Sequence, residues 1–173
     1  LRIGSLYPSP ATDKHPQPAE AIALINASDE PVRLSGLRIE VVSTRRGKKT
    51  TQSMTLSCKG VIDAGEELWL AANVMSFSRQ FGRLPTLASS GSGGEVKSLG
   101  DAWTPLPDGR AVVRLYQPGS GHVDTVAYNL TSKPWQPDGD ALWIGPAVAP
   151  TQSSSVTGKR QLIRRDRTVQ GTL

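Results

Sequence analysis

Short runs in which apolar and polar residues alternate, each bounded by turn residues, most strongly constrain the fold of this chain. The alternation is clear in residues 37–44, where polar side chains separate Leu37, Ile39 and Val41. Successive side chains of a β-strand point to opposite faces, so this run predicts a strand with one buried face. Further strands are predicted within residues 1–7, 20–26, 51–58, 62–72 and 110–129. The 17 Gly and 13 Pro provide frequent reversals between them, which favours an all-β protein.

Two pairs of these strands are predicted to form hairpins. Residues 45–49, "RRGKK", join two alternating runs, and Gly47 supplies the reversal, so the basic residues should lie at a hairpin tip. Residues 118–121, "PGSG", form the second turn. The run "EAIALIN" is almost continuously apolar, which suits a strand buried on both faces as well as a half-buried one. Its Ile22 and Leu24 are predicted core residues.

Two segments interrupt this rhythm. Within residues 73–82, Val74, Phe77 and Phe81 recur at spacings of three and four, and Gly82 can end a helix, so one short helix is predicted there. Residues 88–95, "ASSGSGGE", are predicted to be a flexible loop. The Pro-rich residues 8–18 are predicted to be a loop as well.

The length of 173 residues suits one domain with a long extension. Residues 1–129 carry strands spaced by turns, the pattern of a β-sandwich. Residues 130–173 are rich in Pro, Gly and Ser, with Trp135 and Trp143 as isolated apolar anchors. We expect this extension to wrap over the sandwich, to add an edge strand through "KRQLIRR", and to end in a basic tail.

The net charge of +5 is concentrated in two basic clusters. The hairpin cluster contains Arg45, Arg46, Lys48 and Lys49, and the tail cluster contains Lys159, Arg160, Arg164, Arg165 and Arg167. Such clusters can bind phosphate groups or an acidic polymer. Alternatively, they are solvated surface charges without a partner.

The sequence predicts no catalytic, cofactor or metal site. Cys58 is the single cysteine, which excludes an internal disulfide and a cysteine-based zinc site, and it is expected to be a small core residue. The two histidines, His15 and His122, fall in a Pro-rich loop and at a hairpin turn, so neither is predicted to lie beside a serine and a carboxylate.

The acidic residues are predicted to stabilise turns. Asp138 and Asp140 in "PDGD" could contribute to a calcium site, but the other positions of a calcium-binding loop are missing, and Asp108 is a further acidic candidate. Asp124 is expected to point outward and to bond its hairpin turn. The matches to the glycosylation pattern at Asn26 and Asn129 are too common to carry weight.

Among the larger apolar side chains, Trp69 and Trp103 are expected to be partly buried, with an exposed stacking platform as the alternative. No apolar run approaches the ~18 residues of a membrane span.

Four segments, in order, resemble the lamin-tail domain family. They are "LRIGSLYPSP", "EAIALINASDEPVRLSGLRI", "VIDAGEELWLAANVMSFSRQFG" and "DGRAVVRLYQPGSGHVDTVAY". In that family a buried strand ending in Asn leads through a polar turn to a short strand ending in Leu-Ser-Gly. Asn26 and Asp29 suit the capping of such a turn, and Gly36 suits the bend after it. The chain departs from the family at Ala23, where a Glu is common, and in a longer connection over residues 88–105.

The resemblance implies an immunoglobulin-like β-sandwich without catalytic residues. Family members form the ends of nuclear lamins or modules of bacterial secreted and surface proteins, some beside nuclease or phospholipase-type domains. It therefore implies an attachment module with a protein or cell-envelope partner, in an extracellular or cell-surface location. Direct, sequence-independent binding of nucleic acid or another polyanion is the alternative, and a role within a hydrolase ranks below both. The opening "LRIGSLYP" leads us to expect a segment of a longer protein, with any targeting signal outside it.

Overall fold

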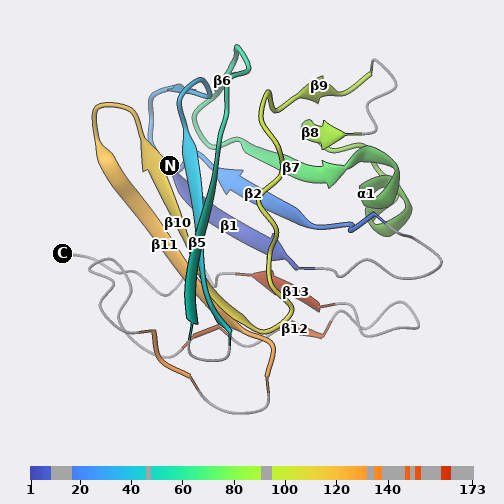
Figure 1. The fold of residues 1–173 in the computed structure, drawn as a ribbon. Helices are drawn as coiled ribbons and strands as arrows, with labels where there is room; N and C mark the ends of the chain where they lie inside the picture. The colour runs from blue at the N-terminus through green and yellow to red at the C-terminus, as the bar shows by residue number, and fades with distance from the viewer. Residues whose placement is uncertain are drawn as a thin grey trace.

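A computed structural model of the protein describes residues 1–8, 17–45, 48–90, 95–131, 135–137, 147–148, 151–152 and 161–164 (Figure 1). Within them the chain is an all-β, sandwich-like fold with one short helix, so the predicted fold class is confirmed. Two sheets provide the layers, and their strands run in clearly different directions in Figure 1. No helix in these ranges is long and apolar enough to cross a lipid bilayer.

The larger sheet has seven strands. In spatial order they are β12 (Thr151–Gln152), β13 (Gln161–Arg164), β1 (Arg2–Tyr7), β2 (Ala21–Ile25), β7 (Glu67–Asn73), β8 (Leu87–Ser90) and β9 (Lys97–Ser98). Pairing is antiparallel from β12 to β7 and parallel from β7 to β9. Strand β13 therefore lies beside β1, although about 155 residues separate them in sequence.

The second sheet has four strands, in the order β11 (Gly121–Asn129), β10 (Arg110–Gln117), β4 (Arg38–Arg45) and β5 (Lys48–Thr55). All three of its pairings are antiparallel. A small two-stranded sheet is formed by β3 (Val32–Arg33) and β6 (Val61–Ile62). Both predicted hairpins are thus present, as β4–β5 and β10–β11.

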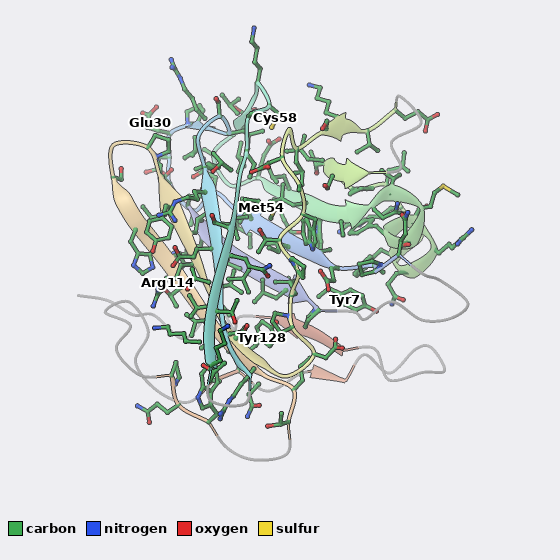
Figure 2. The ribbon with its side chains drawn as sticks, viewed as in Figure 1. Tyr7, Glu30, Met54, Cys58, Arg114 and Tyr128 are labelled. Carbon is green, nitrogen blue, oxygen red and sulfur yellow. The ribbon has the colours of Figure 1, made fainter. Side chains whose placement is uncertain are left out.

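The main core lies between the two large sheets. Ile22 and Leu24 of β2 are fully buried there, as predicted, and they share the cluster with Ile39 of β4 and Leu115 of β10. Burying one such side chain stabilises the fold by roughly 1.5–3 kcal/mol, so this cluster supplies much of the driving force. Met54 is the one buried residue of β5 and points into this core (Figure 2).

A second apolar cluster covers the opposite face of the seven-stranded sheet. Helix α1 (Val74–Phe81) begins at Asn73, whose side chain accepts a hydrogen bond from the Ser76 N–H, and ends at Gly82 with a left-handed φ of 67°. Its Phe77 packs beside Trp69 over small alanines of β2 and β7. Strand β2 is consequently buried on both faces, which decides between the two readings of its apolar run.

The outer face of the four-stranded sheet is covered only in part. Val42 and Val112 form a small buried cluster there, with Trp135 and Ala147 packed against it. Val148 pairs with Tyr128 of β11, so residues 147–148 lie along the edge of that strand. Trp143, the other expected anchor, falls outside the described residues.

Two boundaries differ from the prediction. The expected flexible loop over residues 88–95 is wrong for residues 88–90, because they belong to β8, where Leu87 and Ala88 are buried against β7. The small residues of "ASS" signal flexibility in isolation, but here a parallel sheet partner fixes their backbone. Strand β5 begins at Lys48, earlier than the predicted residue 51, because its pairing with β4 continues to the turn.

Candidate interaction surface

The β4–β5 hairpin carries the hairpin cluster at its end. Arg45 and Lys48 are the last paired positions of the ladder, so two residues, Arg46 and Gly47, connect the strands. Lys48 and Lys49 are exposed, whereas Arg46 and the side chain of Arg45 lie outside what the structure describes. The predicted basic tip is therefore present at Lys48 and Lys49.

Of the tail cluster, only Arg164 lies within the described residues. Arg164 is the last residue of β13 and pairs with Ser5, which places its backbone on the seven-stranded sheet. The other members, Lys159, Arg160, Arg165 and Arg167, fall outside the described residues. A shared polyanion site formed by both clusters thus stays a prediction.

Strand β5 is exposed over most of its length. Six consecutive residues, Lys48 to Ser53, are exposed, although successive side chains point to opposite faces. Both faces of this part of the strand are therefore accessible. Strand β5 also ends its sheet and stands at the front in Figure 1.

The top of β5 is held by a carboxylate. The Thr55 N–H donates a 3.1 Å hydrogen bond to Oδ2 of Asp101, which lies in the segment that connects β9 to β10. The backbone N–H groups of Thr55 and Ala102 lower the pKa of the Asp101 carboxyl, because they stabilise its charged form. An edge N–H of β5 thus already binds a carboxylate.

A planar stack crosses the outer face of the four-stranded sheet. The Arg38 guanidinium lies 3.8 Å from the ring centre of Tyr116, and the His122 ring stacks on Tyr116 at 5.0 Å. Glu40 accepts 3.0 Å hydrogen bonds from both Arg38 and Arg114. Figure 2 shows Arg114 on the outer side of the sheet, away from Met54.

Glu40 is the electrostatic centre of that stack. Partial burial by itself raises the pKa of its carboxyl, but hydrogen bonds and charge from Arg114 and Arg38 outweigh burial and lower it. The positive charge of each arginine is therefore partly neutralised within the protein. The stack presents planar side chains more than free charge.

Of the two histidines, His122 is held in place by contacts with its neighbours. His122 Nε2 lies 2.7 Å from the Thr125 hydroxyl and 3.2 Å from the Asp124 carbonyl oxygen, while the ring stacks on Tyr116. These contacts hold the ring within the sheet face. His15 falls outside the described residues.

The expectation that Asp124 points outward is wrong. Its side chain is buried, and Oδ2 accepts a 2.7 Å hydrogen bond from the Ile3 N–H, so it bonds β1. A carboxylate is expected at the solvent face because burial is costly, but the backbone N–H at the β1 irregularity between Ile3 and Ser5 compensates for that cost. Asp124 thereby ties the two large sheets together.

The remaining acidic candidates do not assemble a metal site in the part of the chain that is described. No group of three His, Cys, Asp or Glu side chains there could hold a metal ion. Asp138 and Asp140 fall outside it. Asp108 lies near Glu20 and raises the pKa of its carboxyl in a minor way.

Glu20 is a buried acid that the sequence reading missed. It precedes β2, and its Oε2 accepts hydrogen bonds from the Trp103 indole at 2.6 Å and from the Leu106 N–H at 3.0 Å. Burial raises the pKa of its carboxyl to about 7 despite these bonds. The sequence signal that could have indicated it is the position of this acid, directly before a continuous apolar run.

Trp69 and Trp103 are both at least partly buried, as expected. Trp69 is buried beneath α1, and Trp103 is half-buried against the main core, with its indole N–H on Glu20.

Cys58, expected in the core, is half-buried and packs against the main core from its rim. Asn26 caps its turn as predicted, because its amide donates to the carbonyl oxygens of Glu30 and Ile62.

A hollow of about 480 Å³ lies between β6 and the start of β7. Apolar Leu34 and Leu68 contribute to its lining, together with charged residues of both signs such as Lys59 and Glu66. The mixed lining selects neither an anion nor a cation. It therefore indicates a ligand class less clearly than the edge of β5 does.

No known protein-family model matches this chain, and no curated protein is detectably similar to it.

Proposed function

We propose that this domain is a non-catalytic interaction module that attaches a larger protein to a protein or cell-envelope partner. One observation carries this proposal: the β4–β5 hairpin exposes six consecutive residues of β5 and places Lys48 and Lys49 near its end. A long, accessible edge strand of a firmly packed sandwich suits contact with another macromolecule.

The lamin-tail resemblance supports the same proposal. Asn26 caps the turn after β2, and Gly36, with φ of 86°, allows the bend between β3 and β4. These features agree with the "NASDEPVRLSGLRI" crossing on which the resemblance rests. On that basis we extend the proposal to an immunoglobulin-like module of a bacterial secreted or surface protein.

Sequence-independent polyanion binding through the hairpin cluster is the second candidate. The exposure of Lys48 and Lys49 favours it, since lysines near a projecting tip can approach several phosphates at once. Each phosphate neutralised on duplex DNA contributes about 0.9 to the slope of log affinity against log salt.

The experiment compares heparin and duplex DNA binding by the wild type and by a variant with Arg45, Arg46, Lys48 and Lys49 replaced by Ser. If the hairpin cluster is the site, the variant binds more weakly with a flatter salt dependence, while its melting temperature is nearly unchanged. A matched variant with the five tail cations replaced measures any contribution of that cluster. Absence of binding by the wild type at low salt would remove the polyanion candidate.

The non-catalytic part is tested separately. The purified domain is expected to leave phosphodiester, ester and glycosidic substrates intact. Metal-dependent turnover that disappears in Asp138→Ala or His122→Ala would overturn this part of the proposal.

A further inference from the structure

The outer edge of β5 presents an ordered row of backbone groups. The Leu56 N–H donates to the Leu37 carbonyl and the Leu56 carbonyl accepts from the Gly36 N–H, so the backbone groups of Leu56 point toward β4. The Thr55 N–H points the other way, to Asp101. Backbone direction alternates along a strand, and the β4–β5 register is regular, so Lys49, Thr51 and Ser53 direct their N–H and C=O groups to the outer edge.

The other sheet ends in the described ranges are short or joined to a neighbour. Strands β12 and β9, which end the larger sheet, contain two residues each. Strand β11, at the far side of the smaller sheet, is joined by Val148. Strand β5 has eight residues, no proline and no register shift. A long, regular edge of this kind is a template for a further strand.

The edge also has a chemical preference. Thr55 shows that one of its outward N–H groups binds a carboxylate. Lys48 and Lys49 place two exposed positive charges at the opposite end of the same strand, and "KKTTQSMT" contains no acidic residue that would neutralise them. An incoming strand with acidic side chains therefore complements both the backbone row and the charge.

We propose that β5 binds an extended acidic peptide segment of a partner protein as an added fifth strand of the four-stranded sheet. The peptide backbone pairs with the outward groups of Lys49, Thr51 and Ser53, and its carboxylates lie near Lys48 and Lys49. This inference rests on the proposed function and gives the partner's binding segment a chemistry. A second copy of this chain suits the edge less well, because its own β5 brings more lysines and no carboxylate.

The test measures binding of a fluorescein-labelled nine-residue peptide of alternating glutamate and valine by fluorescence anisotropy. Lys48→Ser/Lys49→Ser should weaken binding at least about 10-fold, whereas the matched double variant Lys59→Ser/Lys97→Ser, which removes the same charge from exposed positions elsewhere, should change it less than about 2-fold. The same peptide with glutamine in place of glutamate should also bind at least about 10-fold more weakly.

A backbone variant separates strand addition from simple charge attraction. Thr51→Pro removes an N–H that points away from β4, and proline is tolerated at such edge positions, so the sandwich should keep its fold. Binding of the peptide should fall at least about 10-fold, because a proline interrupts the pairing edge. Heparin or DNA binding, if present, should be unchanged in this variant.

Amide hydrogen exchange of the wild type gives a readout that needs no variant. Exchange is followed by NMR, and a saturating concentration of the peptide should slow it at the amides of Lys49, Thr51 and Ser53. If Thr51→Pro binds the peptide as the wild type does, or these amides stay unprotected, strand addition is wrong while binding by the hairpin stands. If the lysine replacements also leave binding unchanged, or the peptide does not bind at low salt, the proposed binding surface fails as well. Protection of the same amides by self-association without peptide would assign the edge to a second copy and overturn the proposal.

Discussion

The Glu20 carboxylate accepts a 2.6 Å hydrogen bond from the indole N–H of Trp103 and so ties the start of β2 to the segment that connects β9 to β10. The same oxygen accepts from the Leu106 N–H. Asp108 and the buried Tyr128 are the titratable groups that interact with it, and Tyr128 donates its hydroxyl hydrogen to the Pro107 carbonyl. One buried acid thus organises the connection between the two sheets.

This arrangement predicts that stability falls as pH rises. The pKa of Glu20 is raised from 4.5 to about 7 by folding, so the folded state holds this proton more tightly than the unfolded state does. The resulting stabilisation is complete below pH 4.5, declines as pH rises, and is lost above pH 7, with an upper limit of about 3 kcal/mol. Urea denaturation of the wild type at pH 5 and pH 9 measures the decline.

Glu20→Gln should flatten this pH dependence, because the amide oxygen still accepts from Trp103 but carries no titrating proton. Glu95→Gln, at an exposed position, serves as the matched control and should leave the pH dependence as it is. An equally steep decline in Glu20→Gln would show that other groups cause it.

Asp124→Ala is expected to destabilise the domain by about 1–3 kcal/mol, because it removes the acceptor of the buried Ile3 N–H. Asp124→Asn retains an oxygen at the same place and should cost less. Thermal and urea denaturation of the two variants provide the comparison. Equal stability of Asp124→Ala and the wild type would mean that the link between β1 and β11 contributes little.

Gly36→Ala tests the bend between β3 and β4. Gly36 has φ of 86°, and an added Cβ would lie 2.8 Å from the Pro118 side chain, whereas Gly65, with φ of 75°, has no atom within 4 Å of that position. Gly65→Ala should cost roughly 1–2 kcal/mol for the left-handed backbone alone. Gly36→Ala should cost clearly more, as measured by urea denaturation, and equal costs would show that Pro118 moves aside freely.

Two substitutions in α1 test how firmly the helix is docked. Phe77 is fully buried, so Phe77→Ala should destabilise the domain by about 3–5 kcal/mol. Met75 is 55% exposed on the same helix, and Met75→Ala should change stability by less than about 0.5 kcal/mol. Denaturation midpoints provide the measurement, and a small effect of Phe77→Ala would indicate that the helix undocks without loss of the sandwich.

Much of the fold follows from local patterns. Alternation identified β4, β10 and β11, Gly47 and the "PGSG" turn at residues 118–121 marked the reversals, and spacings of three and four located α1. These features depend on neighbouring residues, so a single sequence contains them. Strand β8 could not be predicted in this way, because it is defined by parallel pairing with β7 and not by the pattern of its own small residues.

The candidate surface could be predicted only in part. The charge of Lys48 and Lys49 is visible in the sequence, but the open edge beside them depends on which strand ends the sheet, and that is a property of the tertiary order. Glu20 was not predicted as a buried acid, and Asp124 was wrongly predicted to point outward, for a related reason. Their acceptable burial depends on donors from Trp103 and Ile3, which lie far away along the chain.

The pairing of β13 with β1 has a mechanical consequence if force reaches the domain, as the proposed attachment function implies. Because the two strands are antiparallel, the first residue of β1 and the last residue of β13 lie at the same end of the pair. Tension applied through Arg2 and Arg164 would peel β13 away one hydrogen bond at a time, whereas loading from opposite ends would shear the registered positions Ser5 and Leu6 together. Strands β12 and β13 would then detach at low force and lengthen the chain. Strands β1 and β2 would stay paired and keep the sandwich intact.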